Sequence, residues 1–210
     1  MKNLIYLLLS LIFITCANNE TKEIQKNLSV NKIPPSAVEE EPYHMGDITV
    51  KWTAYKHTDK IPVNGKFEKF QVTNFTESSD LKTAITGVKF NILVSSTNTN
   101  DKSRDQKIVN SFFKKMVNTD TISGYINTLE NNGSGKIYLS MNGENIEKNY
   151  SWIMDEKNRE IFIKTSINVL DWGAGNALNA LNEVCLERHT GTDGINKLWP
   201  DVDITVIAEL

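Results

Sequence analysis

The sequence predicts an all-β domain, an antiparallel β-barrel of eight strands accompanied by two short helices. From Met45 onward, apolar and polar residues alternate in about eight segments, which is typical of strands with one buried face. Short polar turns join several neighbouring segments, and strands do not alternate with helices as they do in parallel sheets. Eight antiparallel strands close naturally into a barrel, because closure leaves no exposed sheet edge.

The expected strands follow this alternation along the chain. The first is the clearest, since Ile48, Val50 and Trp52 alternate with Thr49 and Lys51. The same period of two predicts strands over residues 48–54, 63–72, 84–95, 121–128, 135–142, 146–154, 160–170 and 202–208.

Two segments have the periodicity of a helix instead. Within residues 101–113, apolar side chains stand at 108, 109, 112 and 113, and Asp101 is a suitable N-cap. Within residues 173–188, Leu178, Leu181 and Cys185 share one helical face. We expect the two helices to cover one end of the barrel.

The apolar face of the strands leaves two possibilities open. The interior of an eight-stranded barrel is about wide enough for its own side chains or for one small ligand. The inward-facing residues therefore either fill a solid core or line a cavity, and alternation alone does not distinguish the two.

Residues 1–16 have the features of a signal peptide that ends at a lipid-bearing cysteine. Lys2 precedes an apolar run of about eleven residues, which is too short to span a bilayer because a spanning helix needs about 20. The run ends in Phe13-Ile14-Thr15-Cys16, which is similar to a lipobox, the signal for attaching diacylglycerol to the cysteine of bacterial lipoproteins. A buried N-terminal element and simple secretion are the alternatives.

Residues 17–44 are expected to form a flexible tether. They are polar, they contain Pro34-Pro35 and Pro42, and no strand or helix period persists through them. Acyl chains on Cys16 would hold the protein to a membrane, with the folded domain of residues 45–210 at the end of the tether. The acidic run Glu39–Glu41 is interpreted as solvated, with a metal site as the alternative.

Composition restricts the choice of partner and of stabilising bonds. The net charge of −3 and the pI near 5.7 argue against a nucleic-acid partner, because binding to phosphates requires a basic surface. The chain has two cysteines, Cys16 and Cys185. If Cys16 carries lipid, Cys185 has no intramolecular partner, which excludes a disulfide framework.

The residues that could support catalysis are few. His44, His57 and His189 lack the spacing of metal ligands, so we predict no metal and no cofactor. Cys185 is interpreted as a buried thiol, but His189 follows one helical turn later, and this pair is the enzyme alternative. The G-x-G within residues 171–176 is interpreted as a turn and helix start, with a phosphate loop as the alternative.

Several segments of the domain are similar to the YceI-like family of bacterial periplasmic and secreted proteins. The pattern G-x-F, S-x-x-T, R-D and F-F occurs in that order, and the resemblance extends over residues 45–210. The segments that carry it are residues 50–57, 63–70, 95–105, 108–113 and 197–204.

The resemblance implies a lipocalin-like barrel that holds an isoprenoid lipid or another long amphiphile, without catalytic residues. Arg104 and Asp105 are marked by the resemblance, and they form either a structural ion pair or a contact to the polar head group of the ligand. The residues expected to bind the apolar chain are Trp52, Phe90, Ile92, Leu139, Met141, Trp152, Ile163, Leu178 and Leu181.

These observations together predict a non-enzymatic binding or carrier protein, anchored through Cys16 in the bacterial cell envelope. We expect the outer membrane, with the domain facing the periplasm, and surface display is the alternative. The alternative function is a structural or partner-binding envelope lipoprotein with a filled barrel and no lipid ligand.

Overall fold

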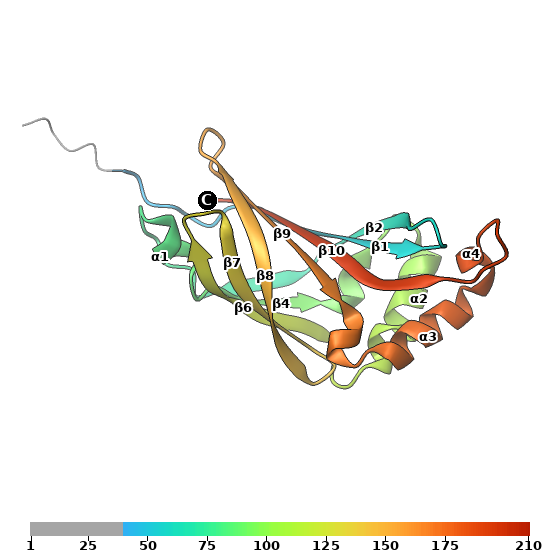
Figure 1. Cartoon of the computed structure of the whole chain (residues 1–210). Coiled ribbons are helices and arrows are strands. Elements are labelled where there is room, and N and C mark those ends of the chain that lie inside the picture. The colour runs from blue at the N-terminus through green and yellow to red at the C-terminus, as the bar shows by residue number, and fades with distance from the viewer. Residues whose placement is uncertain (1–39) are drawn as a thin grey trace, which may run out of the picture. The chain divides into compact units, whose positions relative to one another are not determined.

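The computed structural model describes residues 40–210, which belong to one compact unit (Figure 1). The expected signal peptide, the lipid attachment at Cys16 and the tether up to residue 39 lie outside the described residues. The end of the expected tether is part of the domain, because Tyr43 pairs with Ser78 and the Arg159 guanidinium lies 4.5 Å from the Tyr43 ring centroid. The domain therefore begins before Met45.

The described strands form one sheet in which every pairing is antiparallel, so the predicted all-β class is confirmed. In spatial order, neighbouring strands are β3-β4-β6-β7-β8-β9-β10-β1-β2-β5. The strands are β1 (Ile48–Lys56), β2 (Ile61–Phe67), β3 (Phe70–Thr73), β4 (Lys89–Leu93), β5 (Thr97–Asn98), β6 (Thr121–Glu130), β7 (Ser134–Met141), β8 (Glu144–Asp155), β9 (Glu160–Asn168) and β10 (Leu198–Glu209).

The described helices are short. The predicted helix over residues 101–113 is confirmed as α2, whose N-cap Asp101 accepts hydrogen bonds from the amides of Ser103 and Arg104. The expected helix over residues 173–188 is divided at Cys185 into α3 and α4. The helices are α1 (Leu81–Ile85), α2 (Lys102–Ser111), α3 (Gly175–Val184) and α4 (Leu186–His189), with 3-10 turns η1 (Val94–Ser96), η2 (Phe113–Lys115) and η3 (Val169–Trp172). Within residues 40–210, no helix has the length and apolar character needed to cross a bilayer.

The expected strand over residues 84–95 is wrong at both of its ends. Residues 81–85 form α1, because the Asp80 carboxylate accepts from the amide and the hydroxyl of Thr83 and so caps a helix start. Ala84 and Ile85 are buried at 0% and 4% exposure. Their apolar character therefore belongs to a buried helix face and not to a strand face. The strand itself, β4, is only the middle of the expected segment.

The sheet has ten strands rather than the eight that were predicted, but they occupy eight positions around the barrel. β3 continues the path of β2 after two residues, and β5 continues the path of β4 after η1. β2 pairs with β5, and β3 pairs with β4. β2 and β3 are therefore one interrupted strand, and β4 and β5 are a second one, paired with the first.

This interrupted pairing closes the sheet. Between the two halves, the Glu68 amide donates to the Ser96 carbonyl at 3.1 Å and the Leu93 amide donates to the Lys69 carbonyl at 2.9 Å. The Ser96 hydroxyl donates to the Leu93 carbonyl at 2.6 Å and accepts from the Lys69 amide at 3.0 Å. We call this junction of residues 67–70 and 93–97 the seam. With the seam bonded, no long edge remains, and the structure is the predicted lipocalin-like barrel.

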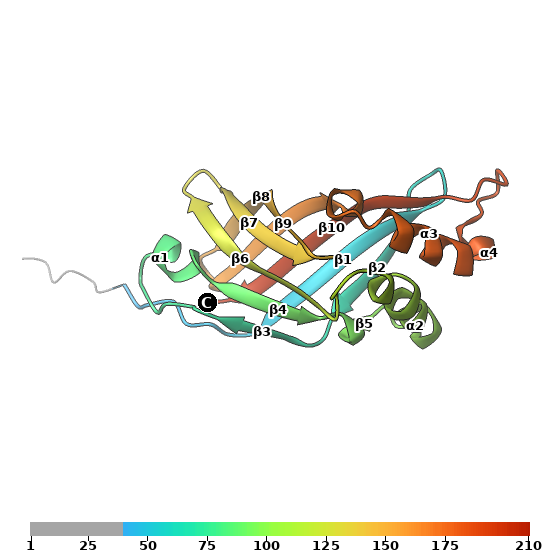
Figure 2. The ribbon, with the colours of Figure 1, turned by 90° about the horizontal axis from the view of Figure 1, so that it is seen from below.

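The helices lie at the two ends of the barrel. α2, α3 and α4 gather at one end, and α1 lies at the other end beside the C-terminus (Figure 1; Figure 2). The prediction that helices cover one end is thus correct for α2 to α4, while α1 was not expected. Beside the barrel, the fully buried Trp172 of η3 donates from its indole nitrogen to the Leu139 carbonyl at 3.0 Å.

Replacing the seam hydroxyl tests the closure. We expect Ser96→Ala to lower the free energy of unfolding by about 1–2 kcal/mol, because the Lys69 amide loses its acceptor. Amide hydrogen exchange at Lys69 and Leu93 should become faster. Ser95→Ala is the matched control, since Ser95 is exposed, and equal urea-unfolding curves for the two variants would contradict the role of the seam.

Candidate ligand-binding cavity

A cavity of about 330 Å³ lies inside the barrel. The strand register places its walls: Val50 lies opposite Val206 and Trp52 lies opposite Ile204 on neighbouring strands. Residues directly opposite each other in an antiparallel pair project from the same face, so these side chains all point inward. Val206 and Ile204 remain half-buried although they face the interior, because the interior is hollow there.

The cavity is elongated. On β10, its lining extends from Leu198 to Ala208, which is about 33 Å of strand at about 3.3 Å per residue. With a strand tilt of about 40°, this corresponds to about 25 Å along the barrel axis. The shape matches one extended chain rather than a compact molecule.

Most of the predicted chain-binding residues line this cavity. The structure brings the following together on its wall: Trp52, Phe90, Ile92, Leu139, Met141, Ile163, Leu178 and Leu181. Their role in binding stays a prediction, but the alternation of the strands and the apolar face of α3 correctly indicated their location.

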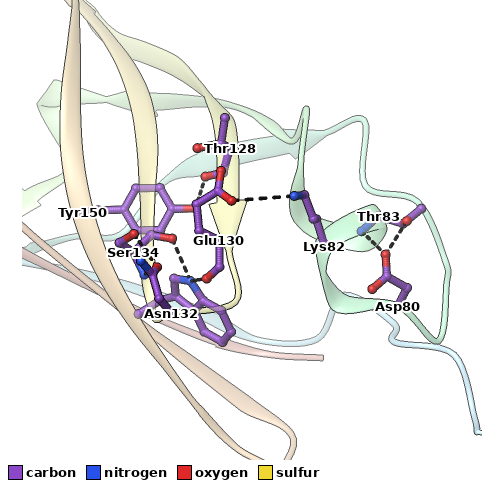
Figure 3. A network of polar contacts seen from close by, with 9 residues as sticks. Asp80, Lys82, Thr83, Thr128, Glu130, Asn132, Ser134 and Tyr150 are labelled. Atoms are coloured by element: carbon purple, nitrogen blue, oxygen red, sulfur yellow. Dashed lines mark hydrogen bonds and ion pairs between the residues drawn. The ribbon is translucent and has the colours of Figure 1, made fainter.

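Trp152 is the exception and does not line the cavity. It lies opposite Ile163 on the inner face, yet its indole N–H turns to the β6–β7 hairpin and donates to the Glu130 and Ser134 carbonyls at 3.1 and 3.0 Å. The neighbouring Tyr150 donates to the Thr128 carbonyl at 2.7 Å (Figure 3). Trp152 is therefore not part of the candidate site, because two hairpin carbonyls already accept from its indole N–H.

Arg104 and Asp105 have separate roles. Asp105 accepts from the amide and the hydroxyl of Thr99 at 2.8 and 2.7 Å, so it attaches α2 to the chain that follows β5. It does not line the cavity, so the structure lends no support to a head-group contact by Asp105. Arg104 does line the cavity, and the carboxylate it faces is that of Asp101, at 3.6 Å. The intrahelical ion pair that was considered is therefore present for Arg104, with Asp101 at the start of α2 as its partner, and not for Asp105.

Buried polar atoms without a partner occur beside the cavity. Within residues 40–210, the side-chain atoms in this state are Trp52 Nε1, Thr97 Oγ1 and Arg104 Nε. Trp52 and Arg104 are wall residues. Native proteins rarely leave buried polar groups unsatisfied, and the indole and guanidinium N–H groups can only donate. An acceptor on a bound molecule would satisfy them.

Gly65 explains how the Trp52 indole fits against the wall. The two residues are paired across β1 and β2, and a Cβ on Gly65 would lie 2.2 Å from Trp52 Cζ2. The glycine thus leaves room for the ring to lie against the strand. The G-x-F element of the resemblance therefore has a local packing reason.

Cys185 and His189 both line the cavity near α4. Cys185 is buried, and His189 Nδ1 lies 2.9 Å from Asn182 Oδ1. Burial, together with smaller contributions from Lys56, His57 and Lys107, lowers the pKa of His189 from 6.5 to about 4. His189 is therefore neutral near pH 7 and is held by an amide.

Sequence reasoning missed several cavity residues that long-range contacts bring to the end of the barrel beside α4. Lys56 Nζ donates to the Arg188 carbonyl at 2.9 Å, and Trp199 Nε1 donates to the His57 carbonyl at 2.7 Å. Lys56, Arg188 and Trp199 all line the cavity. Nothing local in the sequence indicates that these distant segments meet.

No protein-family model matches the sequence, and no curated protein matches it. The crystal structure of BcnA from Burkholderia cenocepacia matches with a TM-score of 0.53 at 12% identity, over 77% of this chain and 94% of that one. A polyisoprenoid binding domain from Saccharophagus degradans, implicated in plant cell wall breakdown, matches with a TM-score of 0.54 at 10% identity, over 80% and 96%. The YceI protein of Campylobacter jejuni gives 0.45 at 16% identity, over 71% and 85%.

Fold and cavity together define a lipocalin-like barrel with a hollow apolar interior. The two structures with TM-scores above 0.5 share this barrel, and at 10–12% identity the similarity shows the fold alone. The chain has the fold of the YceI-like proteins, as the resemblance of its sequence predicted.

Protonation of His189 should weaken the fold in acid. Because its folded-state pKa is lowered, neutral His189 favours the folded state above pH 6.5, and this contribution is lost as the pH falls toward about 4. The loss is at most about 1.4 kcal/mol per pH unit. Urea unfolding at pH 7.5, 6 and 5 should show a flatter pH dependence for His189→Gln than for the wild type. His44→Gln is the control, since His44 is exposed and pairs with Glu77; identical slopes in all three proteins would refute the assignment.

Proposed function

We propose that this protein binds or carries a polyisoprenoid or a similar long-chain amphiphile. The observation that carries the proposal is the elongated cavity of about 330 Å³, whose wall is overwhelmingly apolar. Ligand sites in proteins are typically concave, mainly apolar and largely preformed, with a few polar groups that fix orientation. The cavity meets each of these criteria.

Burial of the apolar chain supplies the driving force. A ligand that buries about 300 Å² of apolar surface gains about 7 kcal/mol at roughly 25 cal/mol per Å². Part of this gain offsets the freedom that the ligand loses on binding. The remainder is enough for stable retention of a chain that is poorly soluble in water.

The structural relatives support the same proposal. The domain from Saccharophagus degradans is described as a polyisoprenoid binding domain, and it shares the fold over 80% of this chain. The cavity of this chain runs through the interior of that shared barrel. A common fold together with an apolar tunnel favours a common class of ligand.

The role that we propose is binding and not catalysis. Cys185 is buried in the cavity wall. A nucleophilic cysteine requires a lowered pKa and an available base. The pKa of His189, lowered to about 4 mainly by burial, makes its imidazole a weak base near pH 7.

Lipid retention is the direct measurement of the proposed function. Mass spectrometry of organic extracts from the purified domain should detect a long-chain lipid in the wild type. In Val206→Trp, the bound lipid should fall by roughly tenfold or more, because Val206 lies between Val50 and Ile163 on the cavity wall and an indole there would fill space that the ligand needs. The matched control is Ile207→Trp, the next residue on the opposite face of β10. Protein that never yields lipid would instead favour a structural or partner-binding role.

We also propose that Cys16 anchors the domain in the bacterial envelope, at the outer membrane and facing the periplasm. The support is the leader of residues 1–16, because acyl chains contribute about 0.8 kcal/mol for each buried CH₂. Cys16→Ser should move the protein from the membrane fraction to the soluble fraction after cell lysis, with the lipid-free form detected by mass. An unchanged distribution would contradict lipid anchoring.

A further inference from the structure

The charged residues on the cavity wall are all cationic. They are Lys51, Lys56, Arg104, Lys107 and Arg188, and within residues 40–210 no aspartate or glutamate lines the cavity. The whole chain, in contrast, has a net charge of −3. The positive charge is therefore a property of this site and not of the protein in general. Lys51 differs from the other cations, because it lies between the inward-facing Val50 and Trp52 and its side chain is exposed on the outer face of the strand.

The other four cations lie at the end of the barrel that α2 and α4 adjoin. Arg104 and Lys107 are three residues apart on α2, which places them on one helical face, and both are half-buried. The same face continues with Ile108 and Phe112, which also line the cavity. One stripe of α2 thus changes from cationic to apolar. The lowered pKa of His189 has burial as its main cause, with Lys56 and Lys107 adding to it, as expected for positive potential here.

Arg104 has donors available for a ligand. Its buried Nε has no partner within the described residues, and its closest ion pair, from its terminal Nη2 to Asp101 Oδ2, is long at 3.6 Å. The other oxygen of Asp101 already accepts from the amides of Ser103 and Arg104 as the helix cap. A guanidinium presents its donors in a fork that fits two oxygens of a phosphate or carboxylate.

The carboxylates near these cations do not neutralise the site. Asp101 lies between Arg104 and Arg188, at 3.6 and 3.9 Å, so one carboxylate faces two guanidinium groups. Asp105 is bonded to Thr99. Glu183 and Glu187 on α3 and α4 are exposed and do not line the cavity. The charge on the cavity wall itself therefore remains positive at this end of the barrel.

We infer that the ligand is an anionic amphiphile whose phosphate or carboxylate head group is bound by Arg104 and Lys107, with Lys56 and Arg188 contributing further positive charge. This rests on the proposed function, because the apolar tail occupies the barrel while the head group meets the cations. A neutral alcohol head would fill the same tunnel but would leave the guanidinium with only its long contact to Asp101. The protein should therefore distinguish two ligands that differ only in the charge of the head.

A matched pair of ligands tests the inference. Geranylgeranyl monophosphate and geranylgeraniol have the same tail, and their affinities are measured by tryptophan fluorescence titration of delipidated protein. We expect the phosphate to bind roughly tenfold more tightly or better at low ionic strength. The difference should shrink as salt is raised from about 20 to about 300 mM. Inorganic phosphate alone is titrated as a third arm and should bind weakly.

Charge-removing variants locate the effect. In Arg104→Gln/Lys107→Gln, affinity for the phosphate should fall to near that for the alcohol, and the affinity for the alcohol should change by a much smaller factor. Lys102→Gln is the matched control, because Lys102 lies on the same helix but is exposed and outside the cavity wall. If the double variant does not fold, Lys107→Gln alone is expected to remove part of the preference.

The possible outcomes distinguish a failure of this inference from a failure of the proposed function. Equal affinity for the alcohol and the phosphate overturns the anionic head group and leaves the carrier function intact. Binding of neither ligand, together with lipid-free purified protein, overturns both. Inorganic phosphate that binds as tightly as the geranylgeranyl phosphate overturns the amphiphile in favour of a free phosphate site. A preference that persists in the double variant overturns the assignment to α2.

Discussion

Closure of the sheet at the seam is the constraint on which the rest of the structure depends. Eight strand positions enclose an interior only if the first and last are bonded, and here that bond is formed by two interrupted strands, one of which is broken by the 3-10 turn η1. Ser96 holds the interruption together, because its hydroxyl donates to the Leu93 carbonyl and accepts from the Lys69 amide. Without these contacts the apolar inner face would open to water, and neither the cavity nor its positively charged end would exist as a site.

A hollow interior makes the empty barrel less stable than a filled one. Wall atoms beside a void lose packing contacts, and the cost in proteins rises by about 24 cal/mol for each Å³ of cavity left by truncation. The barrel tolerates this through fully buried packing elsewhere, such as Leu129 and Trp172 at 1% and 0% exposure. The proposed chain-like ligand would restore the missing contacts, and its binding would then stabilise the fold.

Much of the barrel could be predicted from the sequence, because the face of a strand is set by local alternation. The same reasoning failed where a local cap or a distant partner decides the outcome. Residues 81–85 became helical since Asp80 caps them through Thr83, although the apolar pattern resembles a strand. Trp152 faces inward as predicted, but hairpin carbonyls turn its indole away from the cavity. The approach of Lys56 to Arg188 joins segments far apart in the chain, and no local pattern encodes it.

The polarity of the two barrel ends gives the bound molecule a direction. The end beside α1 is covered by the buried Ala84 and Ile85 and contributes apolar residues to the cavity. The end beside α2 to α4 contributes Arg104, Lys107 and a neutral His189 to the same wall. The cations at this second end are half-buried or exposed. With its head group bound there, the proposed amphiphile would extend its tail toward α1, because the wall in that direction is apolar.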